Sequence, residues 1–117
     1  MTLKTLIRKY YKAYLERKLD VVKEILDPKF EAISGMMKFH NAQDYLDGSW
    51  SNSENLVDIK FELEVIDEEK NTAFYVLKWD FGNSKMETAE YLEVRDEKIT
   101  KIVWINMSPD FYSKIIG

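Results

Sequence analysis

The stretch Val57-Asp-Ile-Lys-Phe-Glu-Leu-Glu-Val65 alternates apolar and charged residues throughout its length. A period of two is typical of a β-strand with one buried and one solvated face, the arrangement found in antiparallel sheets. All five apolar residues of the stretch are therefore expected to face the core. Turn sequences separate three further predicted strands that follow it: residues 73–81, 86–95 and 98–106. The second half of the chain is thus predicted to be a four-stranded antiparallel meander.

The first half of the chain has a helical period. Apolar residues recur at spacings of three and four from Leu3 to Tyr14, which predicts a helix over residues 1–18. A shorter amphipathic helix begins at Leu19 and is expected to end at Pro28, because the residue before a proline disfavours the helical conformation.

A small hairpin and a third helix lead into the meander. The hairpin strands are predicted at residues 30–34 and 36–39. Asn41 is a favourable N-cap and predicts a helix over residues 42–50, followed by a polar loop. Together these elements predict an α+β domain of residues 1–117, with three helices on one face of a curved, mainly antiparallel sheet in the order α-α-β-β-α-β-β-β-β.

Composition excludes several classes of protein. The 117 residues fit one domain, and the absence of cysteine excludes disulfide frameworks and thiol nucleophiles. The 17 basic residues against 21 acidic ones argue against binding to nucleic acid. No apolar run approaches the length of a membrane span or signal peptide, so a soluble cytoplasmic protein is expected. With one histidine and isolated glycines, no metal site, cofactor or nucleotide-binding loop is predicted.

The predicted order of helices and strands includes three specific stretches: Leu6-Ile-Arg-Lys-Tyr-Tyr-Lys-Ala-Tyr14, Leu26-Asp-Pro-Lys-Phe30 and Glu90-Tyr-Leu-Glu-Val-Arg-Asp-Glu-Lys-Ile99. Together with the order of the elements, these stretches resemble the nuclear transport factor 2-like superfamily, in particular its SnoaL-like members. The resemblance covers nearly the whole chain and implies a cone-shaped fold, in which a strongly curved sheet wraps around a helix and a pocket opens between them. The superfamily includes ketosteroid isomerases, polyketide cyclases, dehydratases, epoxide hydrolases and proteins that only bind or assemble, so the fold leaves function open.

The ketosteroid isomerase type places a first-helix tyrosine and a protonated strand acid around an oxyanion, with an aspartate as base. Aligned by hand, this sequence has Tyr10 at the tyrosine position and Glu90 at or near the acid position. The base position falls on Ser34, and a serine does not take a proton from carbon at neutral pH without activation. The resemblance therefore implies Tyr10 and Glu90 as candidate catalytic residues without supplying the base.

Glu90 is also singled out by its place in the pattern, because it shares a strand face with Met86, Leu92 and Val94. A carboxyl group on an apolar face is a candidate functional acid with a raised pKa. The alternative is a structural acid bonded to Tyr10, Tyr14 or a tryptophan N–H. Tyr11, 100° around the helix from Tyr10, is expected to pack or to be partly exposed.

Further side chains could line an apolar pocket around Glu90, since aromatic walls with few polar groups suit a small-molecule cavity. The predicted ligand-binding residues are Tyr14, Trp50, Tyr75, Trp79, Leu92, Trp104, Asn106 and His40. Core packing explains any single aromatic residue equally well, a strand-end cap explains Asn106, and a solvated loop explains His40.

Alternation also predicts which apolar side chains lie on the outer face of the sheet: Phe74, Val76, Tyr91, Val103 and Ile105. A contiguous apolar patch usually marks an interface, so a homodimer through this face is expected. The alternative is that the C-terminal residues Phe111, Tyr112, Ile115 and Ile116 fold back over the same patch.

Three functions fit the sequence. The first is a protein that binds a small apolar or amphipathic molecule around Glu90. The second is an acid–base enzyme of the isomerase, cyclase or dehydratase type, acting on a carbonyl or hydroxyl compound. The third is a non-catalytic homodimerisation module whose cone is filled by its own side chains.

Overall fold

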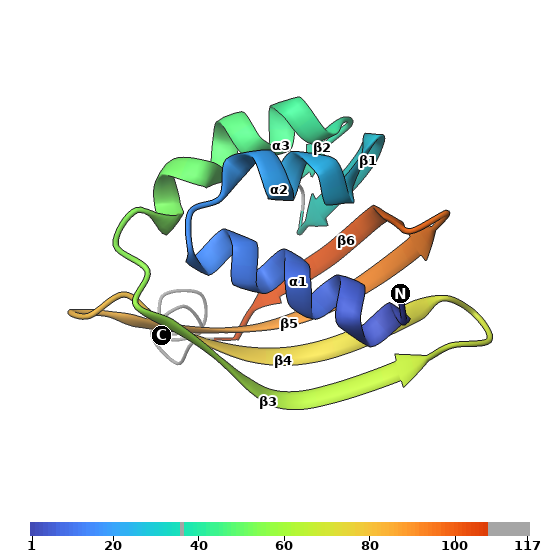
Figure 1. Cartoon of the computed structure of the whole chain (residues 1–117). Helices are drawn as coiled ribbons and strands as arrows, with labels where there is room; N and C mark the ends of the chain where they lie inside the picture. The colour runs from blue at the N-terminus through green and yellow to red at the C-terminus, as the bar shows by residue number, and fades with distance from the viewer. Residues whose placement is uncertain (36, 108–117) are drawn as a thin grey trace.

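Within residues 1–35 and 37–107, which the computed structural model describes, three α-helices lie on one side of a six-stranded sheet (Figure 1). The helices are α1 (Leu3–Leu15), α2 (Leu19–Ile25) and α3 (Ala42–Ser49), and a short 3₁₀ turn, η1 (Trp50–Ser53), follows α3. The strands are β1 (Leu26–Ser34), β2 (Met37–Phe39), β3 (Asp58–Asp67), β4 (Thr72–Asp80), β5 (Lys85–Arg95) and β6 (Lys98–Asn106).

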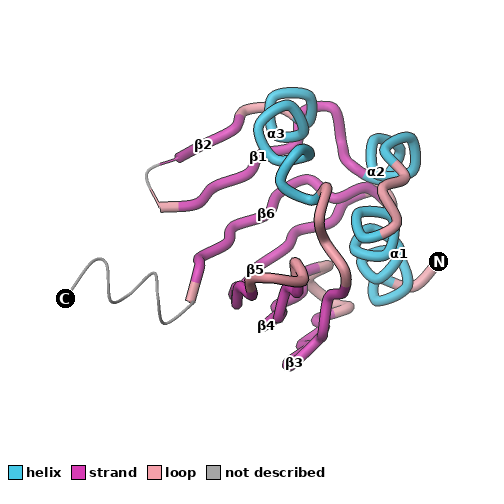
Figure 2. The backbone as a smooth tube through the Cα atoms, turned by 90° about the vertical axis from the view of Figure 1, so that its left-hand side faces the viewer, coloured by secondary structure: helices cyan, strands magenta, loops and turns pink. Residues whose placement is uncertain are grey.

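The strand order across the sheet is β2-β1-β6-β5-β4-β3, and only the β1–β6 pair is parallel in this described part. The open sheet curves around α1, and all three helices lie on its concave side (Figures 1 and 2). This arrangement confirms the predicted fold class and the four-stranded meander of β3 to β6.

Two helix ends differ from the prediction. Helix α1 ends at Leu15, because Arg17 adopts a left-handed conformation (φ 59°) and the Lys18 N–H bonds back to the Ala13 carbonyl, as in a Schellman motif. Helix α2 ends at Ile25, so Pro28 lies within β1 and does not terminate the helix. The register of β1 against β6 shifts between Leu26 and Glu31, and the missing N–H of the proline falls in this irregular stretch.

Helix α1 is buried on more than one side. Tyr10 and Tyr14 face the interior as predicted, with 2% and 7% of their surface exposed. Of the two alternatives predicted for Tyr11, packing or partial exposure, the structure shows packing: the residue is 1% exposed and its ring meets Trp79 and Tyr75 edge-on. The reason is that the curved sheet covers the helix face next to the one that packs toward α3.

A β-bulge inverts the alternation of β3. Phe61 pairs with Leu77 but Leu63 pairs with Val76, so Glu62 is an extra residue on this strand. Beyond the bulge Leu63 and Val65 are about half-exposed, at 47% and 51%. The prediction that the whole apolar set faces the core is therefore wrong after Phe61. Val57, ahead of the strand, is exposed as well.

The bulge turns Glu64 toward α1, where it forms an ion-pair cluster at the rim of the concave face. Arg8 donates to both carboxylate oxygens through Nε (2.7 Å) and a terminal nitrogen (3.1 Å). The Tyr75 hydroxyl donates to the same carboxylate at 2.8 Å, and the Lys4 ammonium lies 3.4 Å away. These partners hold the pKa of Glu64 down to about 2. Two basic residues of α1, Lys4 and Arg8, are thus paired with an acidic residue of the sheet.

The outer face of the sheet carries two apolar rows that cross several strands. One row is Val65, Phe74, Tyr91, Val103 and Ile33, and the other is Leu63, Val76, Ala89 and Ile105, as the strand register sets them side by side. We call these nine residues the outer patch. It includes every residue predicted for the outer face, and Phe74 and Ile105 are 39% and 49% exposed. The alternative occupant, residues 111–116, lies outside the described residues.

We expect Glu64→Gln to lower the free energy of unfolding at neutral pH by about 1 kcal/mol, since it removes the charge from a part-buried bidentate pair. Because the pKa of Glu64 is lower in the folded state, its stabilisation is present above pH 4.5 and is lost as the pH falls toward about 2. Urea denaturation at a series of pH values should show a shallower acid loss for the variant. Glu69→Gln, an exposed carboxylate in the β3–β4 turn, is the matched control, and equal acid slopes for the two variants would contradict the assignment.

Candidate functional site

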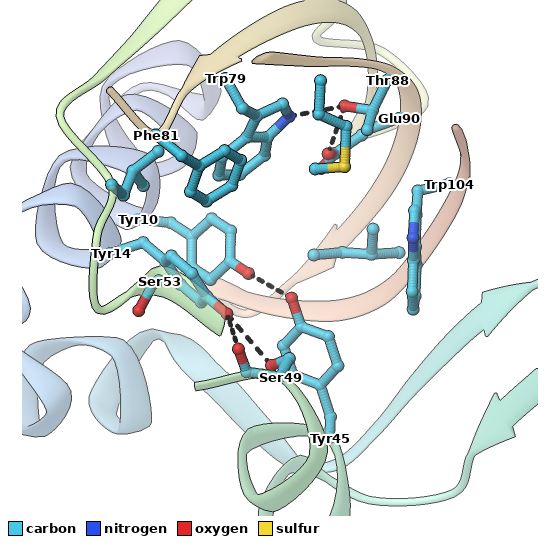
Figure 3. A pocket seen from close by; sticks show the side chains of 13 residues that line it. Tyr10, Tyr14, Tyr45, Ser49, Ser53, Trp79, Phe81, Thr88, Glu90 and Trp104 are labelled. Atoms are coloured by element: carbon cyan, nitrogen blue, oxygen red, sulfur yellow. Dashed lines mark hydrogen bonds between the residues drawn. The ribbon is translucent and has the colours of Figure 1, made fainter. Parts of the chain in front are cut away.

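A cavity of about 210 Å³ opens between the helices and the concave face of the sheet (Figure 3). Its walls are mainly aromatic and aliphatic, with a few hydroxyl groups and one carboxyl group. The lining residues are Tyr10, Tyr14, Tyr45, Ser49, Ser53, Leu56, Trp79, Phe81, Met86, Thr88, Glu90, Ile102 and Trp104. This volume suits a compact ligand, because pockets for drug-sized molecules start at about 300 Å³.

The wall formed by α1 and α3 carries hydroxyl groups. The hydroxyls of Tyr10 and Tyr45 share a hydrogen bond of 2.9 Å, and the Tyr14 hydroxyl donates at 3.1 Å to both the carbonyl and the Oγ of Ser49 (Figure 3). Burial raises the pKa of Tyr10 and of Tyr14. This wall is therefore polar and uncharged at neutral pH.

The wall formed by the sheet carries a chain of buried hydrogen bonds that ends at Glu90. The indole N–H of Trp79 donates to Thr88 Oγ1 at 2.8 Å, and the Thr88 hydroxyl donates to Glu90 Oε2 at 2.8 Å (Figure 3). From α1, the Tyr11 hydroxyl donates to the other oxygen, Oε1, at 2.6 Å. Glu90 is 6% exposed, and the pairing of strands places it between Tyr75 and Trp104.

Desolvation raises the pKa of Glu90 above its usual value, and the hydrogen bonds from Tyr11 and Thr88 oppose that rise. No lysine, arginine or histidine is among the described residues that line the cavity. Glu90 is thus a carboxyl group whose protonation state is set by burial against hydrogen bonding, with no basic side chain beside it.

Five of the predicted site residues line the cavity together: Tyr10, Tyr14, Trp79, Glu90 and Trp104. The expected link between Tyr10 and Glu90 is replaced, because Tyr11 bonds to the carboxyl group and Tyr10 bonds to Tyr45. A helix turns by about 100° per residue, so the two adjacent tyrosines point in different directions: Tyr10 lines the cavity and meets Tyr45 of α3, whereas Tyr11 packs against the sheet and meets Glu90.

The other predicted residues lie away from the cavity walls. Trp50 packs edge-on behind Tyr14, with ring centroids 5.1 Å apart. Tyr75 and Leu92 are fully buried core residues, and the Tyr75 hydroxyl is directed to Glu64. His40 is exposed between β2 and α3.

Two further positions at strand ends also lie outside the lining. Asn106 ends β6 opposite Thr88, and Ser34, at the aligned base position, ends β1. Neither of them contributes a group to the lining as the structure describes it.

Four polar lining residues were not predicted from the sequence: Thr88, Tyr45, Ser49 and Ser53. The sequence pattern could have predicted Thr88, because it stands two residues before Glu90 and therefore lies on the same face of the strand. The pattern could also have predicted that Tyr45 and Ser49 act together, since a spacing of four places them on one face of α3.

No helix in the described part of the chain is long and apolar enough to cross a membrane. Across residues 1–35 and 37–107, no three His, Asp or Glu side chains gather in an arrangement that could hold a metal ion.

No protein-family model and no curated protein matches the sequence. Solved structures do resemble it. A nuclear transport factor 2-like protein from Cytophaga hutchinsonii has a TM-score of 0.72 at 13% identity, over 96% of both chains. A candidate ketosteroid isomerase from Kribbella flavida has a TM-score of 0.80 at 15% identity, over 91% of this chain and 78% of that one.

A candidate polyketide cyclase from Sinorhizobium meliloti has a TM-score of 0.71 at 14% identity, over 86% of this chain and 93% of that one. The chain therefore has the nuclear transport factor 2-like fold, as its sequence suggested. These identities are too low to carry an activity from one protein to another, so the site itself must carry the functional argument.

We expect the carboxyl carbon of Glu90, followed by NMR during a pH titration, to report a pKa above 4.5. Tyr11→Phe should raise that pKa further, because the lost hydrogen bond favours the ionised form. Tyr10→Phe is the matched control, since its hydroxyl bonds to Tyr45. An ordinary pKa in the wild-type protein, or equal responses to the two variants, would contradict this account of Glu90.

Proposed function

We propose that the protein binds a compact, largely apolar small molecule in the cavity, with Glu90 as the central polar contact. The observation that carries the proposal is the buried carboxyl group of Glu90 in the wall of an otherwise aromatic and aliphatic cavity. A buried carboxyl group is costly to desolvate, and stability alone gives little reason to place one beside an empty space.

The distribution of polar groups supports ligand binding over a core filled by its own side chains. The hydroxyl wall of Tyr10, Tyr14 and Tyr45 and the carboxyl group of Glu90 lie on different walls, with apolar side chains between them (Figure 3). Few polar groups converging on an apolar space is the usual composition of a small-molecule site. The Kribbella and Sinorhizobium proteins, named for isomerase and cyclase activities, have the same fold.

An acid–base enzyme is the second candidate, favoured by the 2.6 Å hydrogen bond between Tyr11 and Glu90. A protonated Glu90 could donate to a carbonyl oxygen and stabilise the negative charge that develops there. In the ionised form the same group could act as a base. Tyr10 would contribute as a further hydroxyl on the opposite wall.

We expect Leu56→Trp, at the partly exposed mouth of the cavity, to weaken ligand binding at least tenfold by filling the space. The probes are benzyl alcohol, benzylamine, acetophenone and benzoate, with affinity measured by ligand-observed NMR. Val57→Trp is the matched control, because Val57 is 63% exposed and does not line the cavity.

Native mass spectrometry of freshly purified protein complements this test, because a retained small molecule would name the ligand class directly. The proposal fails if no probe binds the wild-type protein and no molecule is retained. Equal losses in the two tryptophan variants would place binding elsewhere on the protein.

We further propose that a second copy of the chain covers the outer patch. The patch crosses strands β3 to β6 and extends to β1, and four of its residues, Leu63, Val65, Phe74 and Ile105, are between 39% and 51% exposed. Both ends of the patch carry charges of both signs: Glu31, Lys101 and Glu93 at one end, Lys78 and Glu87 at the other. Two copies of the chain can pack through this face about a two-fold axis with opposite charges aligned, which favours a homodimer.

Sedimentation velocity is expected to give a dimer of the 13.9 kDa chain, and Ile105→Lys should convert it to a monomer by burying a charge in the interface. Val57→Lys, at an exposed apolar position outside the outer patch, should leave the dimer intact. A monomeric wild-type protein would overturn the proposal and leave residues 111–116 as the alternative cover.

A further inference from the structure

Glu90 is a buried acid in the cavity wall, and none of the described residues that line the cavity is a lysine, arginine or histidine. We propose that its ligand is a compact organic cation, a protonated amine on an apolar body, with the Glu90 carboxylate as its counter-ion. The inference rests on the proposed ligand-binding function and deepens it by naming the chemical class of the ligand.

The direction of the buried hydrogen bonds favours the carboxylate form for this role. An indole N–H can only donate, so the Trp79 N–H obliges Thr88 Oγ1 to accept. The single hydroxyl proton of Thr88 is then directed to Glu90 Oε2, while the Tyr11 hydroxyl donates to Oε1. Both carboxylate oxygens are thus held as acceptors. Each still has a lone pair for an N–H donor from a ligand.

No positive charge of the described chain compensates this carboxylate. The titratable groups that interact with it are Tyr11 and Tyr14 from α1 and Tyr45 from α3, and the pKa of each tyrosine is raised. Strands β4 and β6 place only Tyr75 and Trp104 beside it. An anion buried with neutral donors alone is costly, and a bound cation would supply the missing charge.

Arg17 is a basic side chain that contacts a lining residue, but its guanidinium is bonded to groups other than Glu90. Its guanidinium donates to the Ser53 hydroxyl and the Trp50 carbonyl, and it lies over the Trp50 ring, 4.8 Å from the centroid. Neither Glu90 nor its two hydroxyl donors is among these partners.

The aromatic walls suit a cation as well. Six of the thirteen lining residues are aromatic: Tyr10, Tyr14, Tyr45, Trp79, Phe81 and Trp104. Figure 3 shows the Trp104 indole edge-on at one side of the cavity, so that a face of the ring is turned to the interior. Aromatic faces attract cations through the negative potential above the ring, most strongly where water is excluded.

A neutral carbonyl ligand predicts the opposite pH dependence. A cation needs Glu90 ionised, so its affinity should rise as the pH rises through the pKa of Glu90, for as long as the amine stays protonated. A carbonyl oxygen needs a donor, so its affinity should fall over the same range. The two ligand classes therefore predict opposite signs for the change of binding affinity with pH.

The test compares benzylamine with benzyl alcohol and acetophenone, which are matched in size, between about pH 5 and pH 8. We expect benzylamine to bind the wild-type protein at least tenfold more tightly than benzyl alcohol at the upper end of this range. Glu90→Gln should abolish that difference. The amide oxygen can accept from Thr88 and the amide N–H₂ can donate to Tyr11, so the variant keeps the buried hydrogen bonds. Glu93→Gln, on the outer face of the same strand, is the matched control.

A second readout needs no variant. Saturating benzylamine should lower the pKa of Glu90 in the NMR titration, because a neighbouring cation favours the carboxylate. Equal affinities for amine and alcohol, or tighter binding of acetophenone at low pH, would overturn the inference while leaving a ligand-binding cavity. Absence of binding by any probe, together with no molecule retained by the purified protein, would overturn the proposed function and this inference with it.

Discussion

The buried carboxyl group of Glu90 is the constraint on which the interior of this protein depends. It lies in the concave face of the sheet, is 6% exposed, and depends on hydrogen bonds from the protein groups around it. Tyr11 supplies one from α1, and Thr88, itself oriented by Trp79, supplies the other from the sheet. A shift of α1 along or around its axis would leave a buried polar atom without its hydrogen-bond partner. The carboxyl group therefore fixes the position of the helix as well as the chemistry of the cavity.

Two glutamates on the concave side show how position sets chemistry. Glu64, at the rim, lies against Arg8 and Lys4, and these cations keep it ionised. Glu90, in the interior, has only neutral donors, and burial raises its pKa. Both accept a hydrogen bond from a tyrosine, so the difference comes from the basic partners and the depth of burial. The rim carboxylate ties the helix to the sheet, and the interior one lines the cavity, where we propose that it contacts the ligand.

The inner and outer faces of the sheet have separate tasks in the proposed function. Alternation along β5 directs Thr88 and Glu90 to the cavity while Ala89 and Tyr91 join the outer patch. A substitution on one face therefore leaves the side chains of the other in place, which is why ligand binding and assembly can be tested independently. The same fold in a candidate ketosteroid isomerase and a candidate polyketide cyclase does not fix the function of this chain.

Local sequence determined the helices, the turns and the four-stranded meander, because periodicity, capping residues and turn residues act over a few positions. It also singled out Glu90, since a carboxyl group on an apolar strand face is visible in the alternation alone. Only the tertiary structure decided that Tyr11, and not Tyr10, bonds to Glu90, because the curved sheet buries a second face of α1. It likewise decided that Glu64 points inward, because a single extra residue at Glu62 reverses every later side chain on β3. Such reversals depend on pairing with a neighbouring strand, which no local pattern records.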